Sequence, residues 1–295
     1  MSEKAVIVDR GYRSYTEERL GRRGAMRAIV KEGFRRVLGL RRKARRKLFP
    51  WVLIGISSAT AFIFVGLHWV AGVALGPSAP DLPNYGEYFD LNSGIAILFI
   101  AFAAPALLVP DRVEGVLNIY LSRPLRMVDY LIAKIGALAI LVLSFYLVPQ
   151  ILLHLGLSVV SSEGFLSYMG ANLDILWKVP VVALAYFGAH AAVAVTAAAL
   201  IPREGFAAGA FFGGLFILNG IGELLTQLDM AGSKYAAFIA IEEFPRVIRD
   251  WVFDIDTVDY LIERSGFDQW MAVPATFGVV ILATLIVWAR YRRLP

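Results

Sequence analysis

Residues 51–75 read WVLIGISSATAFIFVGLHWVAGVAL, a run without an acidic side chain, a lysine or an arginine. A helix needs about 20 mostly apolar residues to cross the roughly 30 Å hydrocarbon core of a bilayer. The whole chain is 58% apolar and 18% charged, whereas soluble domains average about 45–50% and about 25%. The sequence therefore predicts an all-α integral membrane protein.

Five further segments have the length and composition of a membrane span. They cover about 91–109, 132–159, 175–201, 205–225 and 270–289. Together with 51–75 they predict one domain of six transmembrane helices within residues 50–293.

The distribution of basic residues predicts the orientation. Residues 1–50 hold 16 of the 29 Lys and Arg residues. With six spans, the segments on the side of the two termini carry 24 of them, and the other side carries five. Basic residues beside spans are typical of the cytoplasmic face. We therefore expect a multi-pass protein of the cell (plasma or inner) membrane with both termini in the cytoplasm, and no nucleic-acid partner.

The N-terminal arm divides into two parts. Residues 1–25 are expected to form a mobile basic tail. Residues 26–49 place apolar side chains near helical spacing among many arginines and lysines, which predicts an amphipathic helix in the inner interface, attracted to anionic membrane lipid. Pro50 is expected to mark the entry to the first span. A plain topology anchor and a contact with a cytoplasmic subunit are the alternatives.

The outer segment 226–269 has its own pattern. Apolar residues between 234 and 264 recur at mixed helical spacing, interrupted at Pro245, with Arg249 and Asp250 on the polar side. This predicts one or two short amphipathic helices lying on the outer leaflet.

Few groups could support catalysis. The chain has no cysteine, which excludes a thiolate nucleophile and Cys-ligated metal. Its three histidines lie in different predicted helices, so we expect no catalytic residues, no metal site and no enzyme activity. Intramembrane ionisable groups are candidates for function. His190 and Glu223 are therefore candidate translocation-path residues, although His190 could simply bond to a neighbouring helix and Glu223 could face solvent.

Two observations concern energy and assembly. The chain lacks the Gly-x-x-x-x-Gly-Lys-[Ser/Thr] phosphate loop, so uphill transport would need a separate motor. Small residues Gly205, Gly209 and Gly213, and more weakly Gly55 and Ala59, are spaced four apart. Such stripes let helices approach closely, which predicts a dimer interface or, alternatively, packing within one subunit.

Residues 111–130 read DRVEGVLNIYLSRPLRMVDY and form a charged island between the second and third predicted spans. The topology places this island in the cytoplasm. Acidic groups near its start suit the N-terminus of a short helix. Pro124 biases Arg123 away from helix and ends it.

The island also carries a family resemblance. The matching residues are Glu114-Gly115-Val116-Leu117, Leu121-Ser122-Arg123-Pro124-Leu125-Arg126, Tyr130 and Lys134, with Ala133 where glycine is frequent. With these residues the chain, over about 26–293, resembles the permease subunits of type-2 ABC exporters, the ABC-2 family.

The resemblance implies a function and partners. Two permease subunits, identical or different, would work with two cytoplasmic ABC ATPase subunits, which bind ATP and Mg. The island would be the coupling helix that docks on the ATPase. The coupling residues implied are Arg112, Glu114, Gly115, Leu117, Leu121, Ser122, Arg123, Pro124 and Leu125. The resemblance also implies re-entrant helices before the sixth span, and a dimer axis at spans one and five. A non-transporting scaffold and an intramembrane enzyme are the alternatives, and the substrate stays open.

Overall fold

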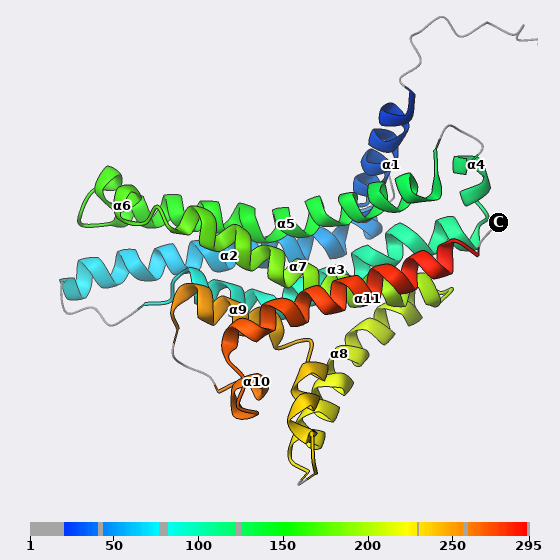
Figure 1. The fold of residues 1–295 in the computed structure, drawn as a ribbon. Helices are drawn as coiled ribbons and strands as arrows, with labels where there is room; N and C mark the ends of the chain where they lie inside the picture. Colours follow the sequence, from blue (N-terminus) through cyan, green and yellow to red (C-terminus); the bar gives the residue numbers. More distant parts are fainter. Residues whose placement is uncertain are drawn as a thin grey trace, which may run out of the picture.

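A computed structural model shows the fold (Figure 1) and describes residues 21–40, 44–76, 82–121, 125–228, 230–255 and 259–293. These residues form helices joined by short connections, and no β-strand occurs among them. Six of the described helices are long and apolar enough to cross a membrane. The predictions of an all-α fold and of six spans are confirmed at that level, and the composition indicates a multi-pass membrane protein.

The long helices are α2 (Ala44–Leu75), α3 (Tyr85–Val113), α5 (Met127–Val160), α7 (Ile175–Leu200), α8 (Glu204–Thr226) and α11 (Ala272–Tyr291). The remaining elements are α1 (Gly21–Val37), α4 (Leu117–Leu121), α6 (Phe165–Ala171), η2 (Ser233–Ile239), α9 (Phe244–Phe253), α10 (Leu261–Arg264) and η3 (Gln269–Met271).

Helix α3 is the centre of the bundle. About 72% of its most apolar stretch is buried, compared with 22% for α8 and for α11. It packs against α2, α5, α7 and α8. In Figure 1 the helices α2, α3, α5, α7 and α11 run along the same direction, while α8 diverges from them and η2 returns beside it. Helices α8 and α11 therefore leave much of their apolar surface to a surrounding membrane.

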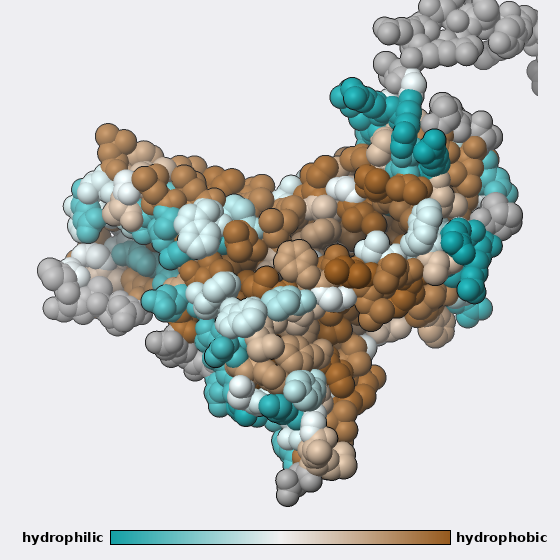
Figure 2. Space-filling view, viewed as in Figure 1, coloured by the Kyte–Doolittle hydropathy of each residue, from teal (hydrophilic) through white to brown (hydrophobic). Residues whose placement is uncertain are grey.

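The bundle has two polar ends. Helices α1 and α4 and the end of α11 lie together at what we call the basic end (Figure 1), and α6 lies at the opposite, far end. In Figure 2 hydrophobic side chains dominate the surface between polar groups at the two ends. This pattern is typical of a protein that spans a bilayer.

The second span is longer than predicted, because α3 begins at Tyr85 instead of about 91. A capping box starts it. The side chain of Asn84 accepts a hydrogen bond from the Gly86 N–H (3.0 Å), and the Glu87 carboxylate accepts one from the Asn84 N–H (2.9 Å). Both bonds satisfy backbone donors that a helix start leaves free. Glu87 and Asp90 make the start of this helix polar, so it does not belong to the apolar run that predicted the span.

The N-terminal arm is two helices, and the prediction of one helix over 26–49 is wrong. Helix α1 ends at Val37 because Gly39 takes a left-handed conformation, with φ +64°. The Leu40 N–H then donates to the Arg35 carbonyl (2.8 Å) and the Gly39 N–H donates to the Arg36 carbonyl (3.4 Å). This pair of bonds is a Schellman cap, which glycine favours. Most of the predicted tail, residues 1–20, lies outside the described residues.

Pro50 does not begin the first long helix. Helix α2 begins at Ala44 and runs through Pro50. Pro50 is the seventh residue of α2, past the first turn, so its missing N–H removes one backbone hydrogen bond from the helix. The basic residues before the span thus extend the same helix.

Helix α1 packs against α5 and α3. Ile29, Gly33 and Val37 are its buried residues. A methyl group at Gly33 would lie only 3.0 Å from side chains of the neighbouring helices, so the helices approach closely there. The Arg22 guanidinium also pairs with the Asp129 carboxylate at the start of α5.

The segment before the last span packs into the bundle. Helix α9 contacts α3, α7 and α11. Pro245 lies in its first turn, where the missing N–H costs nothing. Arg249 and Asp250, on the polar side of the predicted helices, are buried. Their burial is explained by the ion pairs described below.

Candidate functional site

At the basic end, the Asp111 carboxylate joins three helices. The Arg36 Nη1 of α1 donates to its Oδ1 at 2.6 Å. The Lys134 Nζ of α5 lies 2.6 Å from its Oδ2, and the Tyr130 hydroxyl donates to the same oxygen at 3.1 Å. We call Asp111, Arg36, Lys134 and Tyr130 the basic-end cluster. It fixes α1, α3 and α5 relative to one another.

The cluster is shielded from solvent. The side chains of Asp111 and Lys134 are 1% and 0% exposed, and that of Arg36 is 14% exposed. Burial opposes the charge of Arg36, but the attraction of Asp111 outweighs it, and the pKa of Arg36 lies above its ordinary value. Removing one partner of such a group leaves an uncompensated buried charge, at a typical cost of about 3–5 kcal/mol.

Helix α4 contacts this cluster through aromatic rings. The Tyr120 ring of α4 lies 5.7 Å from the Tyr130 ring, and the Tyr130 ring lies 6.2 Å from that of Tyr291 at the end of α11. Aromatic pairs at such separations contribute about 0.5–1.5 kcal/mol beyond area burial. A movement of α4 would therefore be passed through Tyr130 to α11 and to the Asp111 carboxylate.

The predicted coupling residues take different positions. Arg112 lies at the end of α3, where its guanidinium donates to the Ile201 carbonyl after α7. Glu114 is the exposed residue that ends α3, and its N–H donates to the Pro110 carbonyl at 2.8 Å. Gly115 turns the chain with φ +68°.

The apolar coupling residues mostly face the bundle. Leu117 and Leu125 are 5% and 7% exposed, so they hold α4 against the rest of the chain. Leu121 is half-buried, and residues 122–124 lie outside the described part. Ile119 and Val113 are 62% and 58% exposed. Sequence reasoning did not choose Val113, although an apolar residue beside a charged turn was the available signal.

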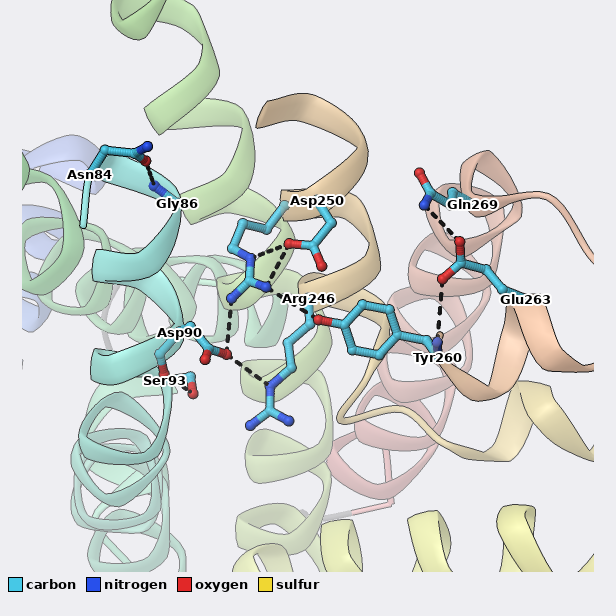
Figure 3. Close-up of polar contacts among 10 residues, drawn as sticks. Asn84, Gly86, Asp90, Ser93, Arg246, Asp250, Tyr260, Glu263 and Gln269 are labelled. Atoms are coloured by element: carbon cyan, nitrogen blue, oxygen red, sulfur yellow. Dashed lines mark hydrogen bonds and ion pairs between the residues drawn. The ribbon is translucent and has the colours of Figure 1, made fainter. Parts of the chain in front are cut away.

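A second ionic cluster lies at the far end (Figure 3). The Arg249 guanidinium on α9 donates from Nε to the Asp250 Oδ1 at 2.6 Å. Its Nη1 lies 2.9 Å from the Asp90 Oδ1 on α3, and its Nη2 donates to the Tyr260 hydroxyl at 3.2 Å. Arg246, which Figure 3 shows beside Asp90, completes this far-end cluster.

In the far-end cluster, burial and ion pairing shift the pKa values of the charged groups in opposite directions. Burial opposes the charge of Arg249, but Tyr186 and Asp250 outweigh it and the pKa of Arg249 is raised. The Arg246 Nη2 lies 2.9 Å from the buried Glu242 carboxylate. Burial raises the pKa of Glu242, although Arg246 opposes the shift. The pairing of Asp90 with Arg246 and Arg249 could not be predicted from the sequence, because Asp90 is distant from α9 in the chain.

The two candidate path residues are not brought together. Glu223 at the end of α8 accepts two 2.8 Å bonds from the Arg264 guanidinium, so it ties α8 to α10. His190 on α7 is 1% exposed, and neither ring nitrogen has a hydrogen-bond partner in the described part of the chain. The alternative that His190 bonds to a neighbouring helix is wrong for these residues.

The glycine stripe is not packed within the subunit. No atom of the described chain lies within 4 Å of a methyl group built at Gly205, Gly209, Gly213 or Gly55, and Ala59 is exposed. A shallow hollow beside the stripe includes Phe206 and Ala210 among its lining residues. Within the described residues, these positions therefore have no close helix contact that would account for the stripe.

Comparisons with protein-family models and with curated proteins find no match to the chain. Among the described residues, no group of three or more His, Cys, Asp or Glu side chains could hold a metal ion.

Proposed function

We propose that this chain is the membrane-spanning permease subunit of an ATP-driven exporter of the ABC-2 type. The observation that carries the proposal is the arrangement around α4. This short helix lies at the basic end, exposes Ile119, and connects through Tyr120 and Tyr130 to the buried Asp111 carboxylate. A helix exposed on one side and fixed to a rigid cluster on the other suits transmission of movement from a partner.

Transmission would follow the contacts already described. An ATPase subunit that displaces α4 moves the Tyr120 ring, and with it Tyr130. Tyr130 and Lys134 share one carboxylate oxygen of Asp111, while Arg36 holds the other. Because separating these buried charges is costly, α1, α3 and α5 would move together instead of absorbing the displacement locally.

The same proposal covers orientation and assembly. The basic end faces the cytoplasm, where Lys and Arg are favoured, and α1 lies at the inner interface. Two copies meet along the open glycine stripe of α8 and the Gly55–Ala59 surface of α2, since close approach of helices in lipid depends on small residues. Two cytoplasmic ATPase subunits bind ATP and Mg, and α9 and α10 lie on the outer side.

ATP hydrolysis that co-purifies with the tagged chain from its native membrane tests the coupling role. The Glu114→Lys and Ile119→Asp variants change exposed groups, so they should lose most of that hydrolysis while keeping the fold. Tyr235→Asp in η2, away from α4 and also on an exposed residue, is the matched control and should keep it. Full activity in all three variants would contradict the proposal.

The oligomeric state in detergent tests the glycine stripe. Gly209→Leu should convert the dimer to a monomer on native electrophoresis. Gly278→Leu on α11 is the control, because its added side chain also enters open space. Loss of the dimer in both variants, or in neither, would refute this interface.

A further inference from the structure

Helix α5 carries a row of buried polar side chains. Tyr146, Gln150 and His154 follow one another at intervals of four residues, which places them on one face of the helix. They are 0%, 2% and 7% exposed. On α7, Tyr186 and His190 repeat the same interval and are equally buried. We call these five residues the polar seam. Polar groups inside a membrane are costly and usually serve a function.

The seam begins beside water at the far end. The His154 Nδ1 lies 2.6 Å from the Tyr85 hydroxyl, which lies 3.2 Å from the Tyr168 hydroxyl. Tyr168 lines an open hollow together with His68, Ser161 and other residues. His154, the first member of the seam, is therefore linked through two hydrogen bonds to a residue that lines the hollow.

Deeper in the bundle, the seam's polar atoms lack partners. The Gln150 Nε2 donates to the Tyr85 carbonyl at 3.0 Å, but its Oε1 has no partner among the described residues. The same is true there of the Tyr146 and Tyr186 hydroxyls and of both His190 nitrogens. The rings are contiguous, with centroids 5.4 Å apart for Tyr146 and Tyr186, and 5.8 Å apart for Tyr186 and His190.

We propose that the polar seam binds a chain of water molecules that enters from the far-end hollow and ends at His190. Buried water typically bonds about three otherwise unsatisfied polar groups, and a buried polar atom left without any partner is strongly unfavourable. His190 lies about 22 Å along α7 from the far-end start of that helix, at 1.5 Å per residue. Beyond it, Ala194 and Ala198 continue the same face as buried apolar residues, so the water chain stops there.

The natural absence of cysteine allows a direct test, since any introduced thiol is unique. Tyr146→Cys and Phe145→Cys replace neighbouring buried aromatic side chains and open comparable space. Phe145 stacks on Phe99 at 5.1 Å, in an apolar environment. In reconstituted membranes, a small charged methanethiosulfonate should modify Tyr146→Cys roughly tenfold faster or more, because only the solvated thiol forms the reactive thiolate. Equal rates would overturn the proposal.

A second measurement decides the question if a cysteine variant fails to fold. Tyr146→Phe removes one seam hydroxyl and keeps the ring. If that hydroxyl bonds to water, the melting temperature falls. If it is truly unpaired, its removal stabilises the protein, so an unchanged or raised melting temperature would overturn the proposal. The outcome does not depend on whether the chain works with an ATPase.

Discussion

The two ionic clusters at opposite ends of the bundle use the same kinds of side chain but differ in burial. At the basic end, Asp111 and both of its cationic partners are shielded, and no side chain in the two ion pairs of Asp111 is more than 14% exposed. At the far end, Arg249 is 5% exposed but its partner Asp90 is 53% exposed. One cluster is closed to water and the other is open on one side.

This difference indicates different mechanical roles. A closed cluster cannot exchange its partners for water, so it holds three helices as one unit and passes on a displacement. The open cluster can replace the ion pairs of Asp90 by hydration at small cost, because charges in contact with water interact weakly. The basic end is therefore suited to transmit movement, and the far end is suited to open and close.

The largest expected effect is that of Asp111→Asn. Loss of this carboxylate leaves Lys134 and Arg36 buried without a counter-charge, so the free energy of unfolding should fall by about 3–5 kcal/mol. Chemical unfolding in detergent micelles measures it. The double variant Asp111→Asn, Lys134→Met should recover part of the loss. If the free energy of unfolding of the single variant fell by less than about 1 kcal/mol, the cluster would be no stronger than exposed ion pairs are.

Arg249→Met should lower the free energy of unfolding by less, about 2 kcal/mol. The reason is that Asp90 can then be hydrated, while Asp250 stays buried. The same unfolding experiment measures this change.

Arg264→Met removes an ion pair whose partners are 43% and 35% exposed, and should lower the free energy of unfolding by less than about 1 kcal/mol. If Arg249→Met proved as costly as Asp111→Asn, the two ends would not differ in the way described.

Gly39→Val tests whether the turn after α1 positions this helix at the basic-end cluster. Residue 39 needs a left-handed conformation, which costs a residue with a Cβ about 1–2 kcal/mol. Gly39→Asn should be milder, because asparagine tolerates this conformation. Thermal unfolding of both variants measures the difference. Equal effects would mean that the cap does not set the end of α1.

The smallest expected effect is a pH dependence at the far end. Because burial raises the pKa of Glu242, the folded protein holds this proton more tightly than the unfolded chain does. Its contribution to stability is present below the ordinary pKa of 4.5 and is lost as the pH rises through the folded value. Glu242→Gln should flatten that part of the stability profile. A profile identical to that of the unaltered protein would exclude Glu242 as the cause.

Much of the fold could be predicted, because long apolar helices follow from composition alone. The starts of the helices were less predictable. The Asn84–Glu87 capping box and the Leu38-Gly39-Leu40 turn are readable in the sequence, but charged or short segments received less weight than apolar runs. The entry of α9 into the bundle was not predictable, since it depends on Asp90, a partner far away in the chain.

Only the presence of a short helix at the candidate site could be predicted from the sequence. The charged island indicated a short helix at one end of the bundle, and α4 is that helix. The sequence pattern could not show that Leu117 would be buried or that Ile119 would be exposed, because the face of so short a helix depends on its neighbours. The pairing of Asp111 with Lys134 and Arg36 depends on how three separate helices pack.

Site-specific cross-linking from Ile119 tests the central claim most directly. The chain has no cysteine, so Ile119→Cys can carry a single thiol-linked photoreactive probe in native membranes, with Tyr235→Cys in η2 as the control. The account predicts that the probe at residue 119 forms an adduct with an ATP-hydrolysing protein and that the probe at 235 does not. An ATPase adduct at 235 alone, or at neither position, would contradict it.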